Sequence, residues 1–151
     1  MSTRLADAAD FDAIMGLYHQ LQPKDPIVER QRLLQTFEII LNDPRLHIFV
    51  FEDQKILATC YLNIVPNLTR GTRSYAIIEN VVTDNAVRNQ GIGQQLMNYV
   101  LDFAWQQECY KVMLQTGAKR EAVHQFYKSC GFTDQDKQAF IAWAPNYTKD
   151  R

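Results

Sequence analysis

The sequence lacks a long apolar run and carries almost no net charge. No stretch approaches the ~20 apolar residues that a membrane-spanning helix needs. The segment 1–16 carries acidic and polar residues where a signal peptide would carry an apolar core. A formal net charge of -1 gives no global electrostatic reason to expect nucleic acid or an anionic membrane as a partner. We therefore expect a soluble, cytoplasmic protein with neither kind of partner.

Cysteine is also scarce. Cys60, Cys109 and Cys130 are odd in number, widely spaced and embedded in apolar segments, which predicts reduced, buried thiols and no metal site. Core-forming residues, in contrast, are plentiful, since 46% of the 151 residues are hydrophobic and 11% are aromatic. A chain of this size buries most of its surface without disulfides. We expect a single domain over residues 1–151.

Apolar periodicity predicts the order of the elements. A short strand at 3–6 precedes a helix that begins after Asp7 and runs to Leu21, and Asp25-Pro26 predicts the start of a second helix that ends at 42–44. Strands are expected at 46–51, 56–65, 75–83, 111–116 and 138–143, and further helices at 92–104 and 119–129. Two helices, an antiparallel hairpin and then a β-α-β-α-β order predict an α/β (α+β) fold, with a mixed sheet that has helices on both faces.

Two glycines open the helix that follows the 75–83 strand, in the segment VRNQGIGQQL at 87–96. Each interior glycine costs a helix about 1 kcal/mol relative to alanine. Between a strand and a helix, the backbone N–H groups of 90–93 would stand at the positive end of the helix dipole, where phosphate binds well. The segment lacks the Gly-Lys-Ser/Thr ending of a P-loop and the third glycine of the dinucleotide fingerprint. An anion cradle and a glycine-rich turn with a frayed helix start both fit this pattern.

Two longer segments resemble motifs of the GNAT superfamily of N-acetyltransferases. They are IENVVTDNAVRNQGIG at 78–93 and HQFYKSCGF at 124–132, each in the strand-to-helix context that the family uses. The resemblance covers nearly the whole chain, and 66–82 is similar to a bacterial group within the superfamily whose acceptors are often unassigned. It implies a mixed, mostly antiparallel central sheet that contains a splayed pair of parallel strands.

The resemblance also implies acetyl-CoA as the co-substrate. In the family, an Arg-x-x-Gly-x-Gly/Ala segment holds the pyrophosphate through backbone N–H groups, which here corresponds to Arg88, Asn89, Gln90, Gly91, Ile92 and Gly93. The preceding Val81, Val82 and Thr83 resemble the strand that pairs with the pantetheine arm as an added β-strand would. Such pairing needs a free strand edge. We therefore expect the strand ending at Thr83 to splay from the one starting at Lys111, by a bulge near 80–82.

Acetyl transfer to an amine needs a base, because freeing the lone pair of a lysine-like amine at pH 7 costs roughly 4.6 kcal/mol. Glu79 is the candidate, since it interrupts the apolar run from Tyr75 to Val82. Partial burial there would raise the pKa of its carboxyl toward the working pH. In many family members a glutamate at this place acts directly or through water, whereas others use different bases. A structural carboxylate bonded to a neighbouring strand or loop is the alternative.

Tyr127 matches the family tyrosine that protonates the departing CoA thiolate, with packing of its ring as the alternative role. Nothing in the sequence marks Cys109 or Cys130 as a nucleophile, so we expect direct transfer in a ternary complex without an acyl-cysteine. The sequence departs from the family where many members carry an asparagine that bonds the pantetheine arm. It has Lys119-Arg120-Glu121 there, which predicts either a contact with a CoA phosphate or a solvated helix start.

The leading hypothesis is an acetyl-CoA-dependent N-acetyltransferase that acts on a primary amine of a small molecule. Acetylation of protein or peptide amino groups and a non-catalytic acyl-CoA-binding module are the alternatives. The acceptor is not named by these residues, because specificity lies in loops and in the first two helices. An uncharged polar helix face is compatible with a homodimer interface or with solvent; it consists of Gln94, Gln95, Asn98 and Gln106.

Overall fold

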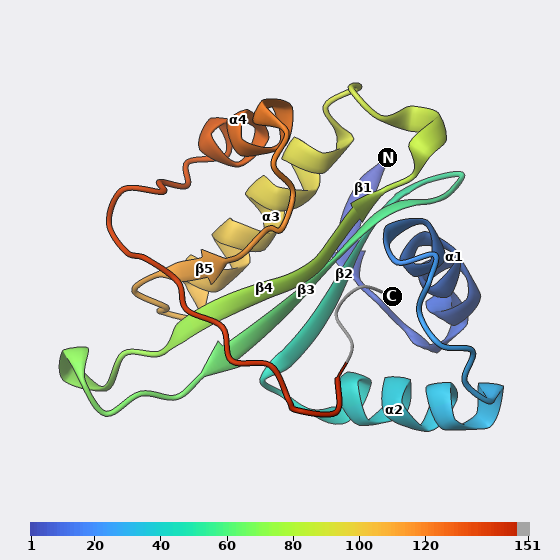
Figure 1. Ribbon diagram of the computed structural model, residues 1–151, viewed down its shortest axis with the longest axis horizontal. Helices are drawn as coiled ribbons and strands as arrows, with labels where there is room; N and C mark the ends of the chain where they lie inside the picture. Colours follow the sequence, from blue (N-terminus) through green and yellow to red (C-terminus); the bar gives the residue numbers. More distant parts are fainter. Residues whose placement is uncertain (148–151) are drawn as a thin grey trace. The chain divides into compact units, whose positions relative to one another are not determined.

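The computed structural model describes residues 1–147 and contains two compact units, Met1–Leu114 and a second unit that begins at Gln115. The first unit holds a five-stranded sheet in chain order. Its strands are β1 (Ser2–Leu5), β2 (Leu46–Asp53), β3 (Lys55–Val65), β4 (Tyr75–Thr83) and β5 (Val112–Leu114). Successive strands pair antiparallel except β4 and β5, which are parallel and are joined through a helix (Figure 1). This confirms the predicted mixed, mostly antiparallel sheet.

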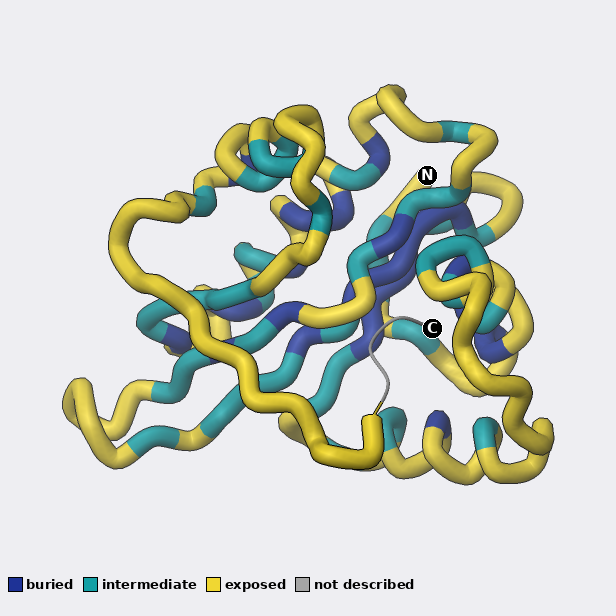
Figure 2. The backbone as a smooth tube through the Cα atoms, in the orientation of Figure 1, coloured by how far each residue is buried: buried dark blue, intermediate teal, exposed yellow. Residues whose placement is uncertain are grey.

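Helices cover both faces of this sheet, as the sequence predicts. On one face α1 (Phe11–Leu21) and α2 (Arg30–Asn42) supply Phe11, Ile14 and Phe37, which form a buried cluster with Ile48 and Val50 of β2. On the other face lies α3 (Ile92–Gln106), whose Phe103 ring centroid is 5.1 Å from that of Phe49. Alternate β2 residues therefore point to opposite helix layers. Figure 2 shows the buried residues running along the central strands between these layers.

The splayed parallel pair is present and begins at a bulge in β4. The parallel ladder pairs Ala76–Ile78 with β5 and ends there. In the ladder with β3, Thr59 pairs with Val82 and Tyr61 pairs with Glu79, so β4 carries one more residue than its partner between these pairs. Asn80, inside this stretch, has a left-handed backbone with φ 54°. A bulge bends and twists the strand that carries it, which confirms the bulge expected near 80–82.

The second unit contains α4 (Glu121–Ser129), which ends at Gly131 with φ 99°. A left-handed glycine is a common helix stop, so the predicted end of this helix is confirmed. The strand predicted at 138–143 is wrong, since this segment is irregular and exposed along its length. Its continuous apolar run suits a strand, but a strand also needs a hydrogen-bonded neighbour, and among the described residues no sheet contains this segment.

The start of α2 also differs from the sequence prediction. The helix begins at Arg30 rather than at Pro26, and Ile27 and Val28 before it are exposed and belong to no helix or strand. β-Branched residues favour helices weakly, which outweighs the start signal of the proline. Arg30 is held by two hydrogen bonds to the Asp12 carboxylate, at 2.7 and 3.2 Å. Within residues 1–147, no helix is long and apolar enough to cross a membrane.

Candidate active site

The candidate site is organised along β4. From Glu79 to Thr83 the strand pairs with β3 alone, because its ladder with β5 stops at Ile78. Val81 and Thr83 are half-buried in this stretch, and Val82 is buried. The side of β4 that faces away from β3 therefore provides backbone groups that could accept an extended ligand as a further strand. This is the arrangement expected for a pantetheine arm.

The loop after β4 is tied down by Asp84. Its carboxylate accepts a hydrogen bond from the backbone N–H of Ala86 at 3.0 Å, which caps the short 3-10 turn Asn85–Val87. The side chain of Gln20, from α1, donates to Asp84 at 3.4 Å and accepts from the backbone N–H of Asn85 at 2.9 Å. Lys55, in the β2–β3 hairpin, lies 3.7 Å from the same carboxylate. Contacts from two other elements thus hold the start of the glycine segment.

The predicted pyrophosphate segment runs from Arg88 to Gly93 and leads into α3. Gly91 is the N-cap with φ 80°, and it offers no side-chain cap. The first hydrogen bond of the helix runs from the Gln95 N–H to the Gly91 carbonyl at 3.1 Å, so the amides of Ile92 and Gly93 precede the helical ladder. The Arg88 guanidinium folds back and donates to the Thr83 carbonyl at 3.4 Å. This geometry suits an anion at the start of the helix.

Glu79 stands on the sheet face that α1 and α2 share. Its direct cross-strand neighbour is Tyr61, which packs against the α1–α2 core cluster. The expectation of a partly buried carboxylate is wrong, because Glu79 is exposed. It is the first residue of β4 beyond the parallel ladder, so β5 does not cover it there. The apolar residues on either side of Glu79 in the sequence predicted its burial, but they could not show where the pairing of β4 with β5 ends.

Sequence reasoning missed the phenol of Tyr18, on α1, which hydrogen-bonds to Asn80 in the bulge. Burial raises the pKa of this phenol well above its usual value, and the hydrogen bond to Asn80 opposes that rise. This contact helps to fix the left-handed Asn80 beside Glu79. In the sequence, helical spacing identified Tyr18 only as one of the inward-facing positions of α1. The hydroxyl group of the tyrosine was the sole signal that this residue could also form a hydrogen bond.

Tyr127 lies in α4 and is described within the second unit. It is half-buried, and its ring centroid lies 5.1 Å from that of Phe126 and 6.0 Å from that of Phe132. His124, one turn earlier, contacts the Ala118 carbonyl through Nε2 at 2.7 Å, which gives it a structural partner. Arg120 is the N-cap of α4 and makes no side-chain cap bond; it and Lys119 are exposed. Both predicted alternatives for this helix start remain predictions.

All three cysteines are buried and free, as predicted. Burial raises the pKa of Cys60 to about 12 and also raises the pKa values of Cys109 and Cys130. A thiol must ionise to act as a strong nucleophile. These environments therefore disfavour an acyl-cysteine.

Known proteins resemble this chain in sequence and in fold. The model of the acetyltransferase (GNAT) family matches residues 12–132. A solved structure of a putative acetyltransferase from Agrobacterium tumefaciens is 43% identical, with a TM-score of 0.90 over 95% of this chain and 100% of that one. The glucosamine-6-phosphate N-acetyltransferase structure from Arabidopsis thaliana is 25% identical, with a TM-score of 0.80 over 95% and 98% of the two chains.

A glucosamine 6-phosphate N-acetyltransferase from Trypanosoma brucei brucei is 33% identical over 84 residues, which cover 56% of this chain and 55% of that protein. The matched part thus spans about half the length of this relative. The family model, in contrast, covers most of the chain and includes both the glycine segment and Tyr127. With the mixed sheet and its splayed β4–β5 pair, this match identifies the chain as a member of the GNAT family of acetyltransferases and as an acyltransferase.

Proposed function

We propose that this chain transfers the acetyl group of acetyl-CoA to a primary amine of a small molecule, by direct attack in a ternary complex. The main support for this proposal is the order of three features along β4 and the loop that follows it. Glu79, the free edge at 81–83 and the glycine segment at 88–93 succeed one another in that order. A pyrophosphate at Gly91 and a pantetheine arm along Val81–Thr83 would point the thioester toward Glu79.

In this proposal Glu79 removes a proton from the acceptor ammonium, directly or through a water molecule. The amine nitrogen then attacks the thioester carbonyl carbon, and the C–S bond breaks as the tetrahedral intermediate collapses. Tyr127 gives its proton to the departing CoA thiolate, and the second proton that the nitrogen loses as the amide forms restores the Tyr127 phenol. The exposure of Glu79 favours a base that an incoming amine can reach from solvent. The raised pKa values of the buried thiols support direct transfer over a covalent enzyme intermediate.

The names of the relatives support a small amine as acceptor, because two of them act on glucosamine 6-phosphate. An amino sugar is therefore the first acceptor class to test. The buried, unpaired thiols support a cytoplasmic location, where thiols stay reduced.

Two substitutions test the assigned roles. Glu79→Gln and Tyr127→Phe should each lower kcat by about 100-fold, because positioned acid–base groups contribute roughly that much or more. Glu38→Gln, on the exposed surface of α2, and Tyr99→Phe, on α3, are matched controls that should keep wild-type rates. Unchanged kcat and pH profile in both active-site variants would refute these roles.

A further inference from the structure

Lys111 lies between two aromatic rings at the start of β5. Its Nζ is 5.5 Å from the ring centroid of Tyr75 and 5.3 Å from that of Tyr110. The guanidinium carbon of Arg70 lies 5.9 Å from the Tyr110 centroid. Among the described residues, no carboxylate pairs with Lys111 or Arg70, so both cations are available to an anion. We call these four residues, Arg70, Tyr75, Tyr110 and Lys111, the Lys111 cluster.

The Lys111 cluster rests on a rigid scaffold rather than on loose side chains. The backbone N–H of Tyr110 donates to the Ser74 carbonyl at 3.0 Å, and that of Ala76 donates to the Lys111 carbonyl at 3.0 Å. These bonds continue the parallel pairing of β4 and β5 to the cluster. Arg73 donates to the Glu108 and Cys109 carbonyls at 3.2 and 3.3 Å, which ties the β3–β4 loop to the turn before β5.

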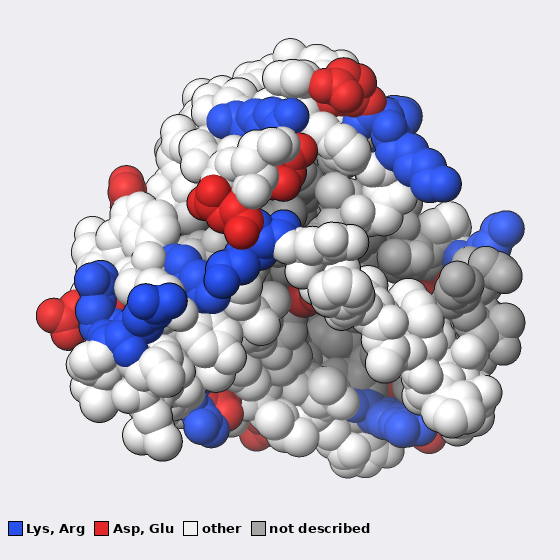
Figure 3. All heavy atoms as spheres, turned by 60° about the vertical axis from the view of Figure 1, so that its left-hand side comes forward, with Lys and Arg blue, Asp and Glu red and all other residues white. Residues whose placement is uncertain are grey.

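The β3–β4 loop itself holds a strained backbone. Arg70, Gly71 and Thr72 are consecutive left-handed residues, with φ values of 56°, 66° and 62°. This conformation is costly for an arginine and more so for a β-branched threonine, and such strain often occurs at ligand clamps. Figure 3, in which the side where this loop extends in Figure 1 comes forward, shows Lys and Arg side chains there with Asp and Glu side chains among them.

The cluster shares a sheet face with the proposed base. Side chains alternate along a strand, so Tyr75, Ile77 and Glu79 point to the same side of β4. Lys111 contacts Tyr75 and therefore belongs to that side as well. Tyr75 and Glu79 are four residue steps apart, which is about 13 Å along the strand.

We propose that the Lys111 cluster binds a phosphate group of the acceptor, while the acceptor's amine lies at Glu79. Two unpaired cations match a phosphate monoester, whose charge at pH 7 is about -1.5 to -2. The tyrosine rings hold the lysine in place through cation–π contacts and exclude water from one side of it. This inference rests on the proposed function and narrows its acceptor to an amine that carries a phosphate.

Glucosamine 6-phosphate and glucosamine form a matched pair of acceptors for the test. The wild-type chain should favour the phosphorylated amine by at least about tenfold in kcat/KM, and Lys111→Gln should remove most of this preference, mainly through KM. Arg70→Gln should reduce the preference less, because its guanidinium is more exposed, and Lys111→Arg should restore part of it. Arg32→Gln, on the exposed surface of α2, removes the same charge and should change neither rate. Equal losses for both acceptors in Lys111→Gln, or no preference in the wild type, would overturn the inference.

Binding measured by calorimetry in the presence of CoA separates this inference from the proposed function. Glucosamine 6-phosphate should bind the wild-type chain at least tenfold more tightly than it binds Lys111→Gln, whether or not turnover occurs. Equal affinities would overturn the phosphate site alone, whereas acetylation of glucosamine without a phosphate effect would leave the proposed function standing. Failure to acetylate any amine, with phosphate-dependent binding intact, would instead refute the proposed function.

Discussion

Alanine at position 91 should damage the protein in two separable ways. Gly91 has φ 80°, a backbone conformation that costs an L-residue with a side chain about 1–2 kcal/mol. An added Cβ would meet no atom within 4 Å, so steric crowding in the folded protein adds nothing to this cost. At about 2–4 °C per kcal/mol for a domain of this size, Gly91→Ala should lower Tm by about 2–8 °C.

The second effect concerns the cofactor. The open space around Gly91 is where the proposed pyrophosphate would approach the amides of Ile92 and Gly93. A methyl group there would lengthen or remove at least one hydrogen bond to a charged oxygen, which is worth about 1.5–3 kcal/mol. The Kd for CoA should therefore rise by roughly 10- to 100-fold, beyond any change that follows from lower stability.

Gly71→Ala is the matched control for this prediction. Gly71 has φ 66°, and an added Cβ there also meets no atom within 4 Å. The control should lose a similar amount of Tm and keep the wild-type Kd for CoA, with Tm measured by calorimetry and Kd by titration. A Gly91→Ala variant that binds CoA within twofold of the wild type would refute the assignment of this turn to the pyrophosphate.

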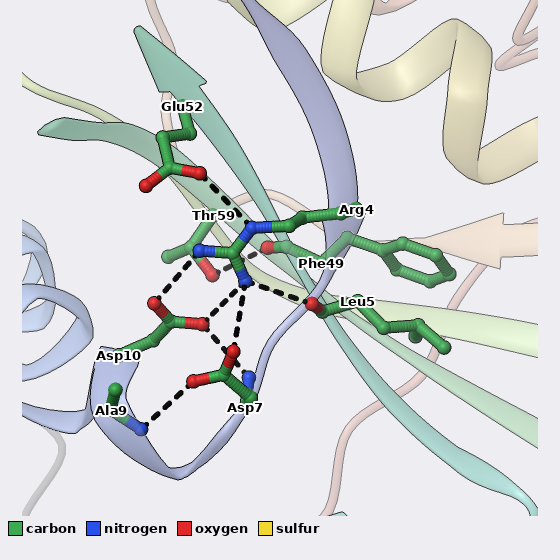
Figure 4. Close-up of polar contacts among 8 residues, drawn as sticks. All are labelled: Arg4, Leu5, Asp7, Ala9, Asp10, Phe49, Glu52 and Thr59. Atoms are coloured by element: carbon green, nitrogen blue, oxygen red, sulfur yellow. Dashed lines mark hydrogen bonds and ion pairs between the residues drawn. The ribbon is translucent and has the colours of Figure 1, made fainter. Parts of the chain in front are cut away.

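Three further predictions concern stability and loop geometry. Arg4 binds Asp10 at 2.7 and 3.0 Å and Glu52 at 3.1 Å (Figure 4), and its guanidinium holds the pKa of the buried Asp10 carboxyl below its usual range. Stabilisation from this contact is present above about pH 4 and is lost as the pH falls through the lower folded-state pKa. Asp10→Asn should thus cost about 2 kcal/mol in urea unfolding at pH 7 and far less near pH 2, and a pH-independent cost would contradict this. Burial lowers the pKa of His47, so the free energy of unfolding should fall as the pH drops below about 6.5. His47→Phe should flatten this fall between pH 7 and 5, and identical pH profiles of unfolding in the two proteins would contradict this prediction. Gln20→Ala removes the bridge to Asp84 and Asn85 and should weaken CoA binding severalfold in the same titration; an unchanged Kd would show that the bridge does not shape the loop for CoA.

Much of the fold follows from local patterns in the sequence. The apolar, β-branched runs at β2 and β3 and the helical spacing of α3 predict these elements because each buries a face whose period is visible in the residues themselves. The bulge at Asn80 was expected from the family resemblance instead, because pairing with a pantetheine arm needs a free strand edge and a bulge can provide one. The start of α2 and the segment 138–143 were mispredicted, because helix starts and strands depend on what the rest of the chain packs or pairs against them.

The candidate site likewise contains residues that the sequence identified and contacts that it could not show. Gly91 and Glu79 were identified from their unusual places within apolar or helical stretches. The amides of Ile92 and Gly93 precede the hydrogen-bonded ladder of α3, and the anion cradle there stays a prediction. The exposure of Glu79 was not predictable, because it depends on where β5 stops. The Tyr18–Asn80 contact and the Lys111 cluster join residues that are distant in the chain, so no local pattern contains them.

The most direct test of the central claim is an assay of acetyl-CoA consumption with a panel of amines, with the products identified by mass. The panel consists of polyamines, amino sugars with and without a 6-phosphate, aminoglycosides, amino acids and peptides. We predict CoA release that depends on a small primary amine and an N-acetylated product, together with a rise in Tm on adding acetyl-CoA. A chain that acetylates none of these small amines, or only the peptides, while acetyl-CoA raises its Tm would contradict the account.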